Sequence, residues 1–514
     1  MNASKRRDLY KPVNLDSSFV RKSMLTNHRQ SERSRLLEAS RQSGYDGKVL
    51  SFKNLNELLS ELKKSIDSNS ADATIAILGQ LLGILKFDLG ESEGAGVELL
   101  AQCLSSNNHQ IVHLAISCIL EIVDNNPGTV ISQEYIAKLA AIFESCTKLV
   151  PTSADQIFVN ILDSVLNLFI MSGFNNFDLI TPYVSSIVDH GVKLLQQTKP
   201  SLFVKTFSAF LCVILESNTA GTQFHDMFAH YRCLDILIQI IKENYSNINK
   251  SFVSTERTML GDILYAIFYF ISSSYNTTYE DYQNVVYIVQ TFLTGLEGVN
   301  IQRESFIPVD EFIVKMDSTF ADVLIPLLQI ISQCTTCKYP DIVNSSISIP
   351  NLQNILRNCF KSPHRSVKLV SLYLCTIMAE GSDQVIEFTI ALIPDIIEIL
   401  KSEENYDIRL ESGVCIVSIY RNALYRKRLD AFKFQILDGF LKLFIQCKHD
   451  YTTVMVSLDY FELFLNIEPT AIEMLYEKNI IEILESAEFL HDDSVRLRIS
   501  KFVENFDTIE PEDS

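Results

Sequence analysis

Residues 115–122 read Ala-Ile-Ser-Cys-Ile-Leu-Glu-Ile, a run whose apolar side chains recur at the spacing of one helix face. Four other stretches align with it on their small and apolar positions, namely residues 161–168, 263–270, 371–378 and 412–419. Only 17 Gly and 13 Pro occur in 514 residues, so the turns that hairpins and all-β folds require are scarce. The sequence therefore predicts an almost entirely α-helical body.

The aligned runs mark a repeat. Taking the third residue of each run and filling the gaps gives eight markers, with successive spacings of 46, 45, 57, 60, 48, 41 and 45 residues: Ser117, Asp163, Ser208, Tyr265, Ile325, Tyr373, Val414 and Asp459. Most spacings match the roughly 40–47 residues of armadillo or HEAT units. The two longer ones predict insertions in the polar stretches 244–256 and 295–317. We therefore expect an armadillo/HEAT-type solenoid of about ten repeats over residues 51–508, with a concave groove; the alternative is an irregular helical bundle.

Charge separates the front of the chain from the rest. Residues 1–41 hold ten basic and four acidic groups, a net charge of about +6, whereas the whole chain carries −19. A short cationic arm joined to a long acidic body predicts that the arm binds an acidic partner or folds back on the body. The acidic body argues against direct nucleic-acid binding, which needs a basic surface.

Two further observations bear on the cellular compartment. The first forty residues lack the apolar stretch of a signal peptide, and no apolar run approaches the roughly 18 residues that span a membrane. The eleven Cys are mostly scattered singly along helical patterns, as small hydrophobic residues are in a reducing compartment. We expect a cytoplasmic or nuclear protein without a membrane segment.

Candidate chemical motifs are few. Cys334 and Cys337 have zinc-knuckle spacing, with Cys359 and His364 downstream, but Cys334 and Cys359 fall on apolar helical patterns and no fourfold ligand set emerges. His109 and His113 lie four residues apart without the Glu that a metalloprotease places after its first His. We expect no metal, no cofactor and no enzymatic activity.

Several segments resemble the importin-α family of armadillo-repeat adaptors. Residues 452–465 (TTVMVSLDYFELFL) are similar to the family's last regular repeat, and residues 481–485 and 493–506 to its closing helices. Residues 265–269 (YAIFY) and 379–386 (AEGSDQVI) are similar to two of its internal blocks. The resemblance implies a right-handed superhelical solenoid that carries protein cargo with basic localisation signals.

The front segment also resembles the family. Residues 7–11 (RDLYK), 16–22 (DSSFVRK) and 29–35 are similar to the importin-β-binding segment, although a four-residue Arg run of the family is reduced to Arg21-Lys22. The resemblance implies that residues 1–42 form an importin-β-binding arm, followed by a linker at 43–50, and that a nuclear export receptor is a further possible partner. The basic residues that it assigns to the arm are Lys5, Arg6, Arg7, Lys11, Arg21, Lys22, Arg29, Arg33 and Arg35.

The family's cargo groove is only partly retained. Family members hold cargo lysines between Trp side chains and bind the cargo backbone with Asn amides four residues further on, but this chain contains no Trp. Only Asn167 is intact among the Asn positions, and Tyr265, Tyr269 and Tyr373 supply aromatic rings. The positions that the resemblance assigns to the groove are Ser117, Glu121, Asp163, Asn167, Ser208, Tyr265, Tyr269, Gln329 and Tyr373.

Composition and periodicity alone predict an acidic helical-repeat binding protein; the family resemblance implies an importin-α-like adaptor in nuclear protein import, located in cytoplasm and nucleus. Cargo would bind in the groove and importin-β would bind the arm, while residues 509–514 form an acidic tail. The alternative is an armadillo scaffold that assembles a protein complex without a transport cycle. Recruitment of importin-β by the arm discriminates between them.

Overall fold

The structure is a computed structural model that describes residues 55–87, 95–125, 131–153, 155–216, 224–245, 254–272, 277–298, 318–467, 470–488 and 493–509. The segments of the chain that it describes contain helices and turns and no strand. They divide into two compact units, which we call the first unit (residues 55–281) and the second unit (residues 282–509).

The first unit begins with paired helices and ends with a group of three. Its elements are α3 (Leu55–Asp67), α4 (Ala71–Phe87), α5 (Ala95–Cys103), α6 (His109–Asn125), α7 (Gln133–Leu149), the 3-10 turn η1 (Val150–Thr152), α8 (Ile157–Asn175), α9 (Phe177–Gln197), α10 (Ser201–Glu216), α11 (His225–His230), α12 (Cys233–Tyr245) and α13 (Ser254–Ser272). Helix α14 (Tyr279–Gly298) begins in the first unit and continues into the second.

The second unit contains mostly groups of three helices. Its elements are α16 (Ser318–Thr335), α17 (Pro340–Ile347), α18 (Leu352–Phe360), α19 (Arg365–Ala379), α20 (Asp383–Ile390), α21 (Ile393–Lys401), α22 (Tyr406–Arg421), α23 (Ala423–Arg426), η4 (Lys427–Phe432), α24 (Lys433–Cys447), α25 (Tyr451–Ile467), α26 (Ala471–Glu477), α27 (Ile480–Glu488) and α28 (Asp493–Ile509).

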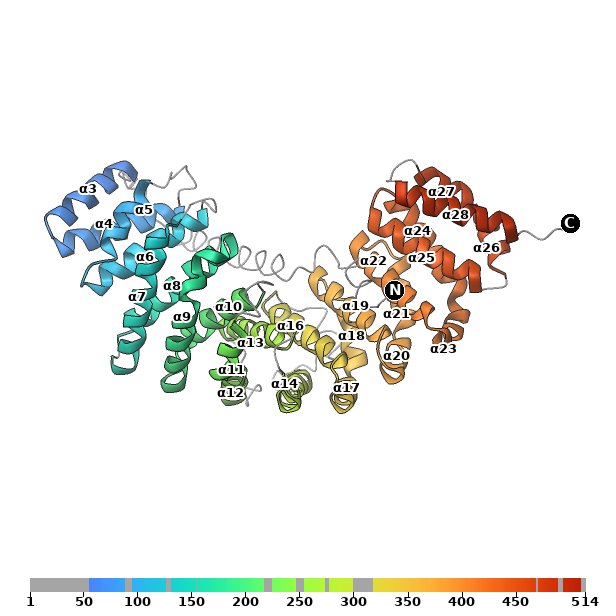
Figure 1. The fold of residues 1–514 in the computed structure, drawn as a ribbon, viewed down its shortest axis with the longest axis horizontal. Coiled ribbons are helices and arrows are strands. Elements are labelled where there is room, and N and C mark those ends of the chain that lie inside the picture. The colour runs from blue at the N-terminus through green and yellow to red at the C-terminus, as the bar shows by residue number, and fades with distance from the viewer. Residues whose placement is uncertain are drawn as a thin grey trace, which may run out of the picture. The chain divides into compact units, whose positions relative to one another are not determined.

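Each unit is built around a row of successive helices that we call its inner row. In the first unit α4, α6, α8, α10 and α13 pack in that order, and in the second unit α16, α19, α22, α25 and α28 do the same. The remaining helices form a second layer, in which α7 packs on α9 in the first unit and α21 on α24 in the second (Figure 1). Each helix buries its apolar face against its neighbours in the stack, which is how repeat proteins form a continuous core.

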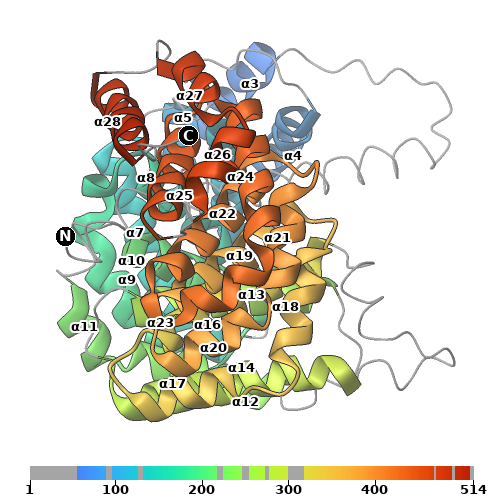
Figure 2. The ribbon, with the colours of Figure 1, turned by 90° about the vertical axis from the view of Figure 1, so that its right-hand side faces the viewer.

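A left-handed turn joins the first two helices in three of the three-helix groups that the structure describes. Arg232, Asn351 and Asn479 have backbone φ angles of 50°, 56° and 52° and lie between α11 and α12, α17 and α18, and α26 and α27. Asn tolerates this left-handed conformation better than most residues, because its short side chain bonds locally. In the second unit, the first helices of three successive groups are α17, α20 and α23. They lie in sequence along one edge of that unit (Figures 1 and 2).

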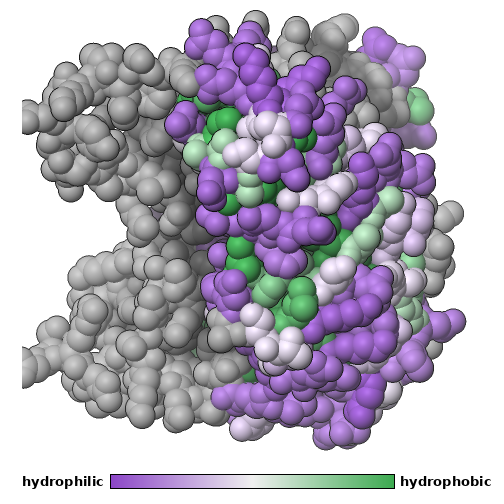
Figure 3. Space-filling model, turned by 90° about the vertical axis from the view of Figure 1, so that its left-hand side faces the viewer, coloured by the Kyte–Doolittle hydropathy of each residue, from purple (hydrophilic) through white to green (hydrophobic). Residues whose placement is uncertain are grey.

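Figure 3 views the side of the molecule on which α3 and α4 lie and shows a broken band of hydrophobic residues among hydrophilic ones. Helix α4 is apolar on most of its faces, and Ile75, Ile77 and Leu82 remain half-buried on it. The first inner helix of a repeat stack has only one inner-row neighbour, so incomplete burial is expected here.

The all-α repeat architecture predicted from the sequence is confirmed. The predicted insertion stretches 244–256 and 295–317 fall mainly between α12 and α13 and between α14 and α16. The arm 1–42, the linker 43–50 and the tail residues 510–514 lie outside the described residues.

Candidate functional site

The groove positions of α6 and α8 are half-buried and hydrogen-bonded within the protein. The Ser117 hydroxyl donates to the carbonyl of His113 at 2.9 Å, and the Asn167 amide donates to the carbonyl of Asp163 at 3.0 Å. The Thr206 hydroxyl on α10 donates to the Asp163 carboxylate across the helix boundary. Glu121 is also half-buried. In this conformation the one intact Asn of the predicted ladder bonds its own helix.

The groove positions of α10 and α13 differ from the prediction. Ser208 is fully buried, and Tyr265 and Tyr269 are only 5% and 6% exposed, whereas exposed positions were expected. Residues 206–215 of α10 carry no charged side chain on any face, and a helix that is apolar all round is buried on all sides. This uncharged run was the signal in the sequence that could have shown the burial of Ser208 on α10.

In the second unit the predicted positions Gln329 on α16 and Tyr373 on α19 are half-buried. Of the three tyrosines assigned to the groove, Tyr373 is therefore the one that reaches the surface of its inner row. The next marker, Val414 on α22, is half-buried as well.

A row of charged side chains that the sequence reasoning missed joins α22, α25 and α28. Arg421 on α22 pairs with Asp459 on α25. From α28, the Arg498 guanidinium contacts Asp459 at 2.5 Å, and it donates to both carboxylate oxygens of Glu462 at 2.7 Å. Burial opposes the charge of Arg498, but the bonds with Glu462 and Asp459 outweigh it and place the pKa of Arg498 above its ordinary value.

These partners are separated by 36–39 residues, which is one repeat. Opposite charges recurring at the repeat length were therefore a usable signal in the sequence. The Arg498–Glu462 pair is bidentate, and bonds of this kind are strong and directional. Together with the Arg421–Asp459 pair, it links the last three inner helices to one another.

A buried carboxyl lies in the same inner row. The Thr376 hydroxyl on α19 donates to the Glu411 carboxyl on α22 at 2.9 Å, and Glu411 is almost completely buried. Burial raises the pKa of Glu411 to about 7, and the Thr376 hydrogen bond lowers it only in part. At neutral pH this group is thus partly protonated inside the α19–α22 contact.

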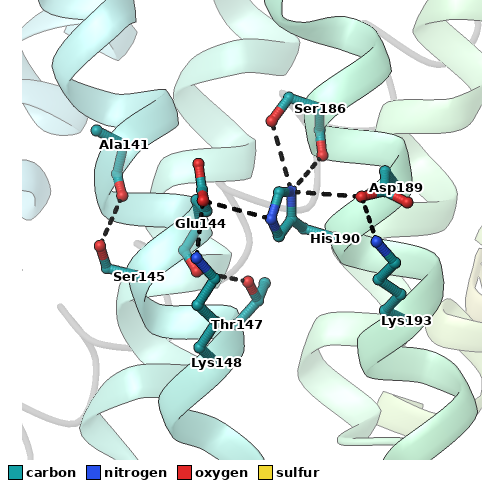
Figure 4. Close-up of polar contacts among 9 residues, drawn as sticks. All are labelled: Ala141, Glu144, Ser145, Thr147, Lys148, Ser186, Asp189, His190 and Lys193. Carbon is teal, nitrogen blue, oxygen red and sulfur yellow. Dashed lines mark hydrogen bonds and ion pairs between the residues drawn. The ribbon is translucent and has the colours of Figure 1, made fainter.

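The second layer of the first unit holds a separate polar cluster on α7 and α9 (Figure 4). The His190 ring lies 3.6 Å from Glu144 and 4.0 Å from Asp189 and bonds the carbonyl of Ser186 at 2.8 Å. Lys148 and Lys193 pair with the two carboxylates at 2.8 and 2.7 Å. The hydrogen bond from Lys148 lowers the pKa of Glu144. The cluster links α7 to α9, two neighbouring helices of the second layer, and belongs to neither inner row.

Burial of the cysteine side chains determines their thiol pKa values. None of the eleven Cys forms a disulfide in the described residues; burial raises the pKa of Cys103 and Cys146 to about 11 and that of Cys359 to about 12. Cys334 is buried and Cys337 half-buried. Within the described part of the chain, no group of three or more His, Cys, Asp or Glu side chains is placed to hold a metal ion. None of the described helices is long and apolar enough to cross a membrane.

The nine arm residues, from Lys5 to Arg35, lie outside the described residues.

Comparison with solved structures reveals the same architecture elsewhere. An engineered protein aligns over 88% of this chain and 99% of its own length, with a TM-score of 0.55 and 14% identity. A chain in a structure of Kap95p with RanGDP, described in connection with nuclear import complex assembly, aligns over 92% of this chain and 54% of its own, with a TM-score of 0.51 and 12% identity. The chain folds as an armadillo/HEAT-type repeat solenoid.

A designed armadillo repeat protein in complex with the peptide (KR)4 aligns over 54% of this chain, with a TM-score of 0.37 and 13% identity. No family model and no curated protein match the sequence.

Proposed function

We propose that this protein is a helical-repeat adaptor that binds a protein segment along its inner rows. The observation that carries the proposal is the continuous inner row of each unit, on which side chains one repeat apart reach the surface. Stacked repeats of this kind present extended binding surfaces that suit an extended peptide better than a small molecule. Binding, not catalysis, is the proposed activity.

The specific role that we propose is that of an importin-α-like adaptor in nuclear import, shuttling between cytoplasm and nucleus. Its support is the ordered sequence resemblance, above all the basic arm at residues 1–42. In this proposal importin-β binds the arm, a protein cargo binds the inner rows, and a nuclear export receptor returns the adaptor. Neither nucleic acid nor membrane is a proposed partner.

A pull-down of importin-β with the full chain and with a chain lacking residues 1–42 tests this role. The proposal expects capture by the full chain and loss of capture on deletion. A full chain in which Arg29, Arg33 and Arg35 are replaced by Gln serves as a matched control for deletion artefacts. Equal capture by all three proteins, or capture by none, would reject the transport role.

The second candidate is a scaffold that assembles a protein complex without transport. The hydrogen bonds of Ser117 and Asn167 within their own helices favour it, because a signal-reading ladder presents these groups to cargo. A scaffold would retain its partners after deletion of residues 1–42, whereas a transport adaptor would lose importin-β.

A further inference from the structure

In the inner row of the second unit, arginine side chains of the protein itself already pair with the acidic residues that could attract a basic ligand. Asp459 lies at a marker position on α25 and receives Arg421 from α22 and Arg498 from α28. Glu462, one turn further along α25, is held by Arg498 through two bonds of 2.7 Å. Figure 1 shows α22, α25 and α28 in the orange to red part of the second unit.

A peptide lysine or arginine would have to displace these guanidiniums. Arg421 and Arg498 are only 25% and 22% exposed, so each is held in place by its surroundings before any ligand arrives. A tethered, pre-oriented partner does not lose translational freedom on pairing, whereas an incoming peptide does. The planar guanidinium also matches a carboxylate in a way that a lysine ammonium does not. Resident arginines therefore outcompete a basic peptide at these two carboxylates.

The inner row of the second unit also carries half-buried apolar side chains, beside the exposed Glu380 that bonds Ser418 of α22. Tyr373 on α19, Leu410 and Val414 on α22, and Met455 on α25 are all half-buried, and their helices pack against one another in order. Met455 adjoins the charged row directly, because its sulfur lies 3.7 Å from Nη1 of Arg498. Contact with apolar ligand side chains would remove from water the apolar area that these residues still expose, which is favourable.

We propose that Arg421 and Arg498 are specificity-determining residues that neutralise the inner row of the second unit, so that it rejects Lys/Arg-rich peptides and binds an uncharged protein segment through apolar side chains. This inference rests on one part of the proposed function, namely that a protein segment binds along the inner row. The ligand that it specifies differs from the basic signal that the family resemblance implies.

Two labelled octapeptides test the proposal by fluorescence anisotropy with the full chain, one of alternating Lys and Arg and one of alternating Leu and Ser. The Arg421→Gln variant frees one oxygen of Asp459 while leaving the Arg498–Glu462 bonds intact. We expect it to raise affinity for the basic peptide by about tenfold at low salt. Adding Asp459→Asn to this variant should abolish the gain. Val414→Asp should weaken binding of the Leu/Ser peptide by about tenfold.

Arg428→Gln is the matched control, because Arg428 pairs with Glu387 at 3.1 Å on the edge of the same unit. It should leave the affinity for the basic peptide within about twofold. A folded Arg421→Gln variant with unchanged affinity for the basic peptide would overturn the proposal. The proposal would also be overturned if the single Asp459→Asn variant bound the basic peptide more weakly than the wild-type chain does. Failure of the importin-β pull-down would instead reject the transport role and leave these peptide results unaffected.

Discussion

At the scale of single residues, the clearest constraint is a glycine at a helix contact. A Cβ atom built on Gly191 of α9 would lie 2.3 Å from Cε2 and 2.7 Å from Cζ of Phe207 on α10. Phe207 is itself buried and stacked on Phe203 with ring centroids 5.4 Å apart, so the ring has little room to move. Gly191 is thus what lets the backbone of α9 approach this aromatic pair.

Gly191→Ala should therefore destabilise the protein by about 1–3 kcal/mol through overpacking. Gly79→Ala on α4 is the control, because a Cβ there meets nothing within 4 Å. That change should stabilise the helix by about 0.5–1 kcal/mol. Urea unfolding of both variants measures the difference, and equal effects of the two substitutions would show that the Phe207 contact is not limiting.

Glu411 makes stability depend on pH. Its pKa of about 7 in the folded protein exceeds the ordinary value of 4.5, so folding disfavours the charged form. A raised carboxyl pKa means that the folded state binds the proton more tightly than the unfolded state. Stability from this group is therefore lost as pH rises from about 4.5 to 7, and the loss is complete above about pH 8.

Glu411→Gln keeps a hydrogen-bond acceptor for Thr376 and removes the titration. The variant should gain stability over wild type as pH rises from 5 to 8, to a maximum on the order of 3 kcal/mol. Thermal unfolding across this range, with the exposed Glu387→Gln as control, measures the gain. A stability difference that stays constant with pH would contradict a titrating Glu411.

At the scale of helices, Arg498 supplies the ion pairs that link α28 to its inner-row neighbour α25. The mean hydropathy of α28 is low, and the helix packs on α25 and α27. Arg498 pairs with Asp459 and Glu462 of α25, whereas Arg496, two residues earlier, pairs with Asp493 of α28 itself. One helix thus offers an interhelix pair and an intrahelix pair for direct comparison.

Arg498→Ala should destabilise the protein by about 1–3 kcal/mol, because Glu462 and Asp459 lose the Arg498 guanidinium while Asp459 keeps its pair with Arg421. Arg496→Ala should change stability by less than about 0.5 kcal/mol, since its pair is exposed. Hydrogen exchange of the α28 amides separates local from global loosening. Equal protection in the two variants would show that the α25–α28 bonds contribute little to holding the helix.

Sequence periodicity predicted the helices because each one buries a regular apolar stripe, a property local to about twenty residues. The ladder alignment did not predict the burial of Ser208, because it assigned that position to the groove by spacing and took no account of the uncharged run around it. The family-based ladder also failed to reveal Arg421 and Arg498. Their partners lie one repeat away, and a pattern read within one helix contains no information on them.

At the scale of the whole chain, contacts between repeats keep a nearly constant sequence separation. Tyr135 bonds the Val97 carbonyl 38 residues away, Thr206 bonds Asp163 across 43 residues, and Arg365 bonds Asp407 across 42. Cys212 contacts the Asp262 carbonyl across 50 residues, where the sequence predicted an insertion. Stability in such a chain is approximately a sum of repeat and nearest-neighbour contributions. Substitutions in distant repeats should therefore act independently.

Charge is the other property of the whole chain, and it bears on the arm. Residues 1–41 carry about +6 and the remainder about −25. A peptide of residues 1–42 should bind importin-β through many exposed ion pairs, each contributing about 1 kcal/mol or less. Because the Debye length shortens from about 14 Å at 0.05 M salt to about 6 Å at 0.3 M, affinity should fall by about tenfold or more over this range.

Calorimetric titration of importin-β with this peptide at several salt concentrations measures the effect. Replacing Arg29, Arg33 and Arg35 with Gln should weaken binding and flatten the salt dependence, since fewer ion pairs remain to be screened. Salt-independent binding would show that apolar contacts dominate the arm. Absence of binding at low salt would contradict the prediction that the arm binds importin-β. The alternative is then that the arm binds the acidic body of its own chain.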